Sequence, residues 1–405
     1  MFELAYGVIL FAVIIHYLNE RFLRIQSTIA ITLGAVLIAL LLMLSHRLGL
    51  TNLQPEMQLF VAKIDFRSLL LNGMLGFLLF AGALTVDLKS LWQAKWEVGV
   101  LALFGTVVST FLVATGVYYL LELLGIRANY LTCLLFGAII SPTDPVAVLA
   151  TLKSVKAPNS LAVKIAGESL FNDGVALVIF ATLYQVAFHG VHPTFSAVSF
   201  LFLKSAIGGL LYGFILGVVA FYLIRPLKDI KTEILITLCL ASAGYTFAQH
   251  IGISGPLAMV VAGLIVGQQV RRRGRLQIGN FWELVEEILN AVLFLLIGLE
   301  LLLLKANWWF VLAGIIVIPL VLFVRFVSVG VPMAWFKRKR HYVPFITTIL
   351  TWGGLRGGLA LAMALALPDN FPARDLVLVL TYSVVLFSII VQGLTAKKVV
   401  RLARH

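Results

Sequence analysis

Charged residues are scarce in this chain, and their scarcity excludes a soluble domain. Only 12% of the 405 residues are Asp, Glu, Lys or Arg, whereas 61% are hydrophobic, and the mean hydropathy is +1.03. The two cysteines, Cys133 and Cys239, lie inside apolar runs, so we interpret them as small buried residues and not as a disulfide. The sequence also has no phosphate-binding glycine loop, nucleophile triad or Cys/His cluster. It therefore indicates neither an enzyme nor an ATP-driven pump, and we expect no cofactor.

Apolar runs long enough to cross a bilayer recur along the whole chain. They predict an all-α polytopic protein of the cell membrane, with about 13 transmembrane helices in a single unit over residues 1–405 and no soluble regulatory domain. The N-terminal run has no basic segment and no cleavage site, so we interpret it as the first span and not as a signal peptide. The predicted spans cover residues 2–18, 28–44, 68–86, 97–121, 130–152, 161–187, 195–223, 232–249, 254–269, 282–304, 307–334, 343–366 and 375–396.

Lysine and arginine are distributed unevenly between the loops. With these spans, 22 of the 31 Lys and Arg residues fall on one side of the membrane, six on the other, and Lys204, Arg325 and Arg356 within spans. The positive-inside rule therefore predicts an N-terminus outside and a C-terminus in the cytoplasm. It also explains the net charge of +13 without nucleic acid as a partner. For Lys204 and Arg325 we expect snorkelling or lipid contact, with a second ion pair as the alternative.

Two predicted spans are interrupted. Pro142 and Pro145 each remove a backbone donor and clash with the preceding turn, so they should open the helix near 141–145. Residues 351–358 contain glycines around a buried arginine, and the alternative for them is close helix packing. The two spans run in opposite directions seven spans apart, which predicts an inverted repeat with a binding site at the interruptions. The glycines of the second interruption are Gly353, Gly354, Gly357 and Gly358.

Carboxylates at membrane depth are the candidate functional groups, because such a charge costs about 3 kcal/mol and is rarely kept without a use. Asp144 follows Thr143 in the first interruption, and Ser169 and Asp173 are four residues apart on one helix face. Hard cations such as Na⁺ are suited by carboxylate, hydroxyl and carbonyl oxygens. The sequence therefore predicts that Thr143, Asp144, Ser169 and Asp173 bind Na⁺.

Arg356 needs a buried anionic partner, and we assign Glu168, with Asn172 as a bridge between them. That assignment leaves Asp144 and Asp173 for ion chemistry. Two carboxylates in a medium of low dielectric cannot both stay ionised at low cost. Proton and cation would then bind the same site in turn, which is sufficient for exchange when the site is exposed alternately to each side.

The segments SPTDPVAVLA, GESLFNDGVALVIF and WGGLRGGLALAMALALP resemble the signature segments of the monovalent cation:proton antiporter-1 family, which includes NhaP-type and NHE-type exchangers. The resemblance implies a homodimer of thirteen-helix protomers with crossed broken helices and Asp173 as the principal carboxylate. It implies a structural Glu168–Arg356 pair held by Asn172. Related electrogenic antiporters carry an aspartate where Asn172 stands, so the resemblance implies electroneutral 1:1 exchange.

The resemblance also implies a division of the chain into parts. Residues 66–187 and 307–396 would form the ion-translocation core, 1–65 and 232–306 the dimerisation scaffold, and 195–231 a linker helix. Some relatives add a glutamate on the third span to the ion shell, but residues 68–86 contain no acidic residue. Water or backbone would then complete the coordination.

Several alternatives stay open at this stage. Exchange of Na⁺ or Li⁺ for H⁺ is the leading hypothesis, K⁺/H⁺ exchange by the same residues is the alternative, and a passive cation channel is a third reading. A channel would favour a ring of equivalent residues or a carbonyl filter, and neither is apparent. We interpret Glu283, Glu286 and Glu287 as an interfacial salt-bridge patch, with a regulatory proton sensor as the alternative.

Overall fold

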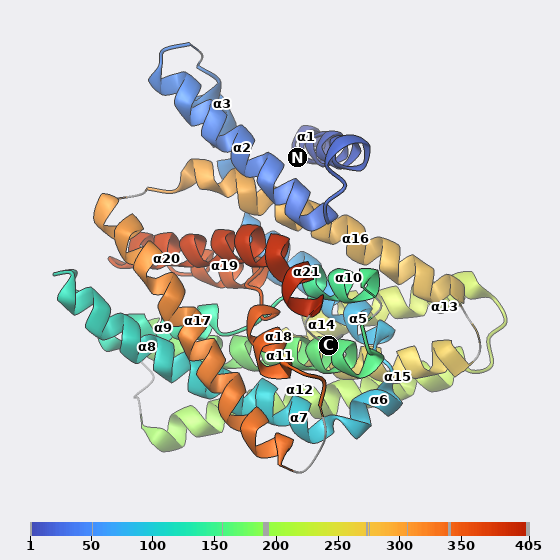
Figure 1. Ribbon diagram of the computed structural model, residues 1–405. Helices are drawn as coiled ribbons and strands as arrows, with labels where there is room; N and C mark the ends of the chain where they lie inside the picture. The colour runs from blue at the N-terminus through green and yellow to red at the C-terminus, as the bar shows by residue number, and fades with distance from the viewer. Residues whose placement is uncertain are drawn as a thin grey trace.

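The computed structural model describes residues 2–50, 52–155, 157–188, 194–272, 274, 276–305, 307–338 and 342–401. Within these residues all regular structure is helical, apart from one isolated bridge between two extended segments (Figure 1). The helices α1, α2 and α3, drawn in blue, lie at one edge of the molecule beyond α16, and the remaining helices pack into one body. The prediction of an all-α fold is therefore confirmed for the described residues.

The elements follow the predicted order. The label η marks a π-helical turn, except for η5, which is a short 3-10 turn. The first part of the chain forms α1 (Phe2–Leu18), η1 (Asn19–Leu23), α2 (Ser27–Arg47), α3 (Leu53–Ala62), α4 (Phe66–Ser68), η2 (Leu69–Met74), α5 (Leu75–Thr85), α6 (Leu88–Gln93), α7 (Lys95–Gly99), η3 (Val100–Gly105) and α8 (Thr106–Leu123). The middle part forms α9 (Tyr130–Ile140), α10 (Val146–Ser154), α11 (Asn159–Phe188), α12 (Phe195–Ile224), α13 (Ile230–Cys239), η4 (Leu240–Gly244), α14 (Tyr245–His250) and α15 (Gly255–Arg272). The last part forms α16 (Leu276–Leu299), η5 (Glu300–Leu303), α17 (Trp308–Lys337), α18 (Ile346–Trp352), α19 (Gly358–Leu365), α20 (Arg374–Phe387), η6 (Ser388–Gln392) and α21 (Gly393–Arg401).

Every predicted span corresponds to a helix or to helical pieces in series. The π-helical turns η2, η3, η4 and η6 join their neighbours, so 66–85, 95–123, 230–250 and 374–401 each run as one helix. Among the described residues, eight helices are long and apolar enough to cross a bilayer. The two interrupted spans fall outside that set because each half has at most 11 residues.

Small residues bring the membrane helices into backbone contact. A Cβ added to Gly213 of α12 would lie 2.3 Å from the carbonyl oxygen of Ala258 on α15. A Cβ added to Gly267 of α15 would lie 2.4 Å from the carbonyl oxygen of Leu84 on α5. Such close approach is typical of helix packing in membranes, where van der Waals contact replaces the hydrophobic effect as the driving force. It fixes α15 against α12 on one side and α5 on the other.

The edge formed by α1–α3 is tied to the body through α16. A Cβ added to Gly298 of α16 would lie 2.4 Å from the Cβ of Ala35 on α2. Thr32 of α2 also donates a hydrogen bond of 3.4 Å from its hydroxyl to the carbonyl oxygen of Phe294 on α16. The predicted grouping of 1–65 with 232–306 as a dimerisation scaffold, apart from a core of 66–187 and 307–396 and a linker at 195–231, stays a prediction.

The cysteines differ in their surroundings. Both are free, and Cys133 is buried, as predicted. The prediction was wrong for Cys239, which is exposed. It lies four residues after Leu235, whose side chain is 63% exposed, so both belong to a face of α13 that points away from the body.

Candidate functional site

The two interrupted helices meet at their interruptions. α9 ends at Ile140 and α10 begins at Val146, while α18 ends at Trp352 and α19 begins at Gly358. Between them the N–H of Asp144 donates a hydrogen bond of 2.8 Å to the carbonyl oxygen of Leu355. Each extended segment thus supplies a partner for backbone that the other leaves unpaired, as non-helical backbone at membrane depth requires.

Arg356 caps the end of α9. Its Nη1 donates to the carbonyl oxygens of Ser141 and Pro142 at 2.7 and 2.8 Å, and its backbone N–H donates to the hydroxyl of Ser388 at 2.8 Å. The side chain is buried. A cation at a helix C-terminus pairs with the carbonyl groups that the helix leaves unsatisfied. Arg356 therefore holds the interruption in shape.

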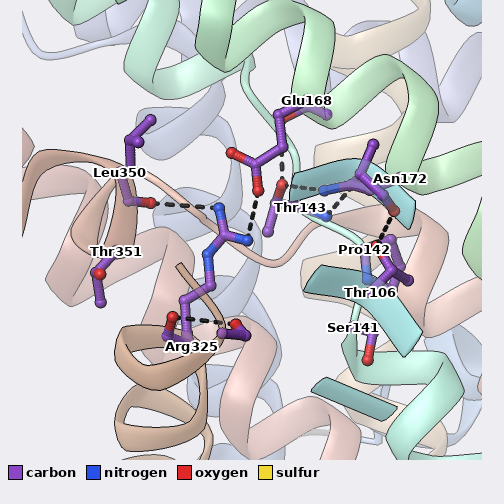
Figure 2. Close-up of polar contacts among 12 residues, drawn as sticks. Thr106, Ser141, Pro142, Thr143, Glu168, Asn172, Arg325, Leu350 and Thr351 are labelled. Carbon is purple, nitrogen blue, oxygen red and sulfur yellow. Dashed lines mark hydrogen bonds and ion pairs between the residues drawn. The ribbon is translucent and has the colours of Figure 1, made fainter. Parts of the chain in front are cut away.

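The predicted Glu168–Arg356 pair was wrong, because Glu168 pairs with Arg325. Oε1 of Glu168 lies 2.5 Å from Nη1 of Arg325, and the two side chains are 2% and 7% exposed (Figure 2). Nη2 of Arg325 also donates to the carbonyl oxygen of Leu350 at 3.3 Å. A Cβ on Gly354 would lie 2.6 Å from Nε of Arg325, so the glycine makes room for the guanidinium. Arg325 thus forms the second ion pair that was the alternative to snorkelling.

Asn172 contacts the first interruption and does not bridge the ion pair. Its Nδ2 donates to the hydroxyl of Thr143 at 2.7 Å, and its Oδ1 accepts from the N–H of Thr143 at 3.3 Å (Figure 2). The hydroxyls of Thr143 and Ser169 lie 3.1 Å apart. All three residues are buried. The predicted bridging role was therefore wrong, and Asn172 instead anchors the extended segment of α9–α10 to α11.

Asp144 and Asp173 line one cavity of about 90 Å³ beside the crossing, whereas Thr143 and Ser169 lie outside its lining. Both carboxylates are half-buried, and Oδ1 of Asp144 accepts a hydrogen bond of 2.9 Å from the N–H of Val146 at the start of α10. A cavity of this size has room for several water molecules, and hence for a cation with part of its hydration shell. The arrangement can therefore bind either a cation or a proton at the carboxylates.

Comparison with known proteins identifies the family of the chain. Residues 53–402 match the family described as the transmembrane sodium/hydrogen exchanger. The chain belongs to that family. It is 44% identical to the Na⁺/H⁺ antiporter NhaP of Pseudomonas aeruginosa over 99% of this chain and 96% of that protein. It is 35% identical to the Na⁺/H⁺ antiporter NhaH of Halobacillus dabanensis over 95% of this chain and 98% of that protein.

The fold of this exchanger-family member also matches a solved structure. The sodium proton antiporter MjNhaP1 from Methanocaldococcus jannaschii at pH 8 superposes with a TM-score of 0.76 over 98% of this chain and 97% of that chain. Their sequence identity is 17%, so this likeness supports the fold alone. It agrees with the predicted bundle that contains two broken, crossing helices.

Two polar residues of the cavity were missed or misplaced by the sequence analysis. Glu286 and Asn290 of α16 line the same cavity as Asp144 and Asp173. The interpretation of an interfacial patch holds for Glu283, which lies 3.7 Å from Lys153 at an exposed pair, but it was wrong for Glu286. The available signal was the spacing of four residues that places Glu286 and Asn290 on one helix face.

A glycine of the second interruption is required by the position of Asp144. A Cβ on Gly357 would lie 2.2 Å from Oδ2 and 2.7 Å from Cβ of Asp144. We expect Gly357→Ala to displace that carboxylate, to reduce exchange strongly, and to lower the free energy of unfolding by about 1–3 kcal/mol through overpacking. Thermal unfolding in detergent and transport in liposomes check this. The control is Gly99→Ala, since a Cβ there meets nothing within 4 Å; equal behaviour of the two variants would contradict the expectation.

Proposed function

We propose that this protein is a secondary active antiporter that exchanges Na⁺ or Li⁺ for H⁺ by alternating access, without a cofactor. The observation that carries the proposal is the shared cavity: Asp144 on α9–α10 and Asp173 on α11 line one space at the crossing of the two interrupted helices. The membership in the sodium/hydrogen exchanger family and the antiporter names of its relatives support it.

Competition between the two ions follows from the electrostatics of the cavity. Two carboxylates close together in a medium of low dielectric repel each other when both are ionised. Either a proton on one of them or a cation between them relieves that repulsion, and one excludes the other. A site that is neutralised by one ion at a time, and that opens to each side in turn, exchanges the two ions.

Exchange of one cation for one proton fits the partners of the other polar groups. Asn172 is uncharged and is engaged with Thr143, Glu168 is paired with Arg325, and Arg356 is held by carbonyl oxygens. Each of these groups already has a partner in the structure. We therefore assign proton exchange to the carboxylates of the cavity, with Asp173 as the residue that exchanges the proton, so that one Na⁺ replaces one H⁺ and the cycle is electroneutral.

The wider setting belongs to the same proposal. The protein would act as a homodimer in the cell membrane, in contact with lipid, with its N-terminus outside and its C-terminus in the cytoplasm, and would serve pH homeostasis. Thr143 and Ser169 would reach the cation only when the site rearranges, because in this structure their hydroxyls bond to each other. Exchange of K⁺ remains the alternative, and the names of the relatives favour Na⁺.

The test is transport by the purified protein in liposomes that contain a pH-sensitive dye. Na⁺, Li⁺ or K⁺ is added outside, with the membrane potential either free or clamped at zero. We expect Na⁺ to drive proton movement at a rate that does not depend on the potential. A rate that changes with the potential would reject 1:1 stoichiometry, K⁺ as the better driver would favour the alternative, and cation flux without proton movement would indicate a channel.

A further inference from the structure

One face of α16 leads from the surface of the protein to the ion cavity. Glu283 lies at the surface of the protein, 3.7 Å from Lys153, and the side chains of the two residues are 56% and 81% exposed. Glu286 is half-buried and lines the cavity, and Asn290, one turn further along, lines it as well. Spacings of three and four residues place all three on the same side of the helix. The face therefore passes from solvent to the carboxylates through polar groups.

On this face, Asn290 is a buried polar residue that has no hydrogen-bond partner in the protein among the described residues. Its side chain is 6% exposed, it lines the cavity, and it forms no hydrogen bond with any residue that the structure describes. Because its side chain lines the cavity, water or an ion in that cavity is the partner that remains for the amide. The carbonyl oxygen of the amide is a suitable ligand for a hard cation.

We propose that Glu286 and Asn290 form a second binding position for the transported cation, between the surface at Glu283 and the carboxylates of Asp144 and Asp173. The inference rests on the proposed function and adds to it. A carboxylate oxygen of Glu286 and the amide oxygen of Asn290 would hold a partly hydrated monovalent cation before it reaches Asp144 and Asp173. The surrounding lining is leucine, valine, alanine, proline and glycine, so these four polar residues are the groups that a cation would contact in the cavity.

A second binding position at Glu286 and Asn290 predicts that substitutions there change the affinity for Na⁺ and not the maximal rate of exchange. A negative charge in a narrow space with apolar walls raises the local concentration of cations. Glu286→Gln removes that charge but leaves the carboxylates of Asp144 and Asp173 in place. We expect the KM for Na⁺ to rise about three- to tenfold, with the maximal rate of exchange at the wild-type level. Asn290→Ala should raise KM in the same direction, and Glu286→Asp should restore most of the affinity.

The matched control is Glu287→Gln, which removes the same charge one residue further along the same helix. Glu287 is exposed and lies outside the cavity lining. Exchange is measured in liposomes over a range of Na⁺ concentrations for both variants and the wild type. A KM that rises in Glu286→Gln and not in Glu287→Gln supports the second position. Equal KM values in the two variants, or a loss of maximal rate in Glu286→Gln, would overturn it.

A measurement that is independent of transport keeps the inference testable. The Na⁺ concentration that gives half-maximal thermal stabilisation of the purified protein should rise by the same factor in Glu286→Gln and Asn290→Ala; an unchanged midpoint would overturn the inference. The proposed function and the second binding position are rejected by different results. A wild-type protein without cation-driven proton movement rejects the proposed function, whereas an active wild type with unchanged KM in Glu286→Gln rejects only the second position.

Discussion

We expect Asp173→Asn to abolish cation-driven proton movement while the protein stays folded. Asparagine has nearly the same shape as aspartate, but its amide neither takes up and releases a proton near neutral pH nor carries a negative charge. The cavity then keeps its volume and loses the group at which cation and proton compete. Exchange in liposomes, followed with an internal pH dye, should fall to the level of liposomes without protein.

The folded state should tolerate this change because Asp173 holds no other part of the structure in place. It lines the cavity and, among the described residues, forms neither a hydrogen bond nor an ion pair. Removing an unpaired, partly buried charge lowers the desolvation cost of folding. The midpoint of thermal unfolding in detergent should therefore equal or exceed that of the wild type, which separates a lost site from a lost fold.

The control for Asp173→Asn is the same substitution outside the cavity. Asp369 pairs with Arg374 at 3.2 Å, and its side chain is 95% exposed. Asp369→Asn should transport at the wild-type rate. Residual exchange in Asp173→Asn that depends on pH would contradict the shared site and would move the proton to another carboxylate of the cavity.

The spans and their interruptions could be predicted from the sequence because both depend on local properties. A run of apolar residues has to be helical at membrane depth, since every backbone group needs a partner within its own segment. Pro142 and Pro145 break such a helix wherever it packs. The glycines of 353–358 were open to two interpretations, and the structure shows both. The helix is interrupted between Trp352 and Gly358, and a Cβ on Gly358 would lie 2.5 Å from the side chain of Leu293 on α16.

The partner of Glu168 could not be predicted because the choice depends on tertiary geometry. Arg325 and Arg356 both lie within predicted spans, and either one satisfies the requirement for a buried counter-charge. Arg356 is engaged by carbonyl oxygens that become free only where the other interrupted helix crosses. No local feature of the sequence shows that crossing. The glycines around Arg356 therefore favoured it over Arg325 as the partner of Glu168, and this choice was wrong.

The depth of Glu286 was misjudged for a different reason. The hydropathy of the span begins to rise near residue 282, but α16 begins at Leu276. Ten residues of helix place Glu286 about 15 Å from the start of α16. When the first turns of a helix are polar, hydropathy places the start of the span too late in the sequence. Glu286 was therefore assigned to the membrane interface, whereas it lines the cavity.

Breaking the buried ion pair between Arg325 and Glu168 should have a large effect on the stability of the protein. We expect Arg325→Ala to lower the free energy of unfolding by about 3–5 kcal/mol, because it leaves the carboxylate of Glu168 buried without a counter-charge. The two side chains are 7% and 2% exposed and their charged atoms lie 2.5 Å apart. A surface pair provides the comparison: Lys153→Ala breaks the exposed contact with Glu283 and should change stability by at most about 1 kcal/mol.

A double-mutant cycle identifies the partner of Glu168 directly. Combining Arg325→Met with Glu168→Gln removes both charges, so the double variant should be more stable than the sum of the single effects predicts, by roughly 1–3 kcal/mol. The same cycle with Arg356→Met should give a smaller coupling energy, since the side chain of Arg356 donates hydrogen bonds to the carbonyl oxygens of Ser141 and Pro142. Denaturant or thermal unfolding in detergent supplies the four stabilities of each cycle. A larger coupling for Arg356 than for Arg325 would restore the pairing that the sequence alone predicts, and would contradict the geometry around Glu168.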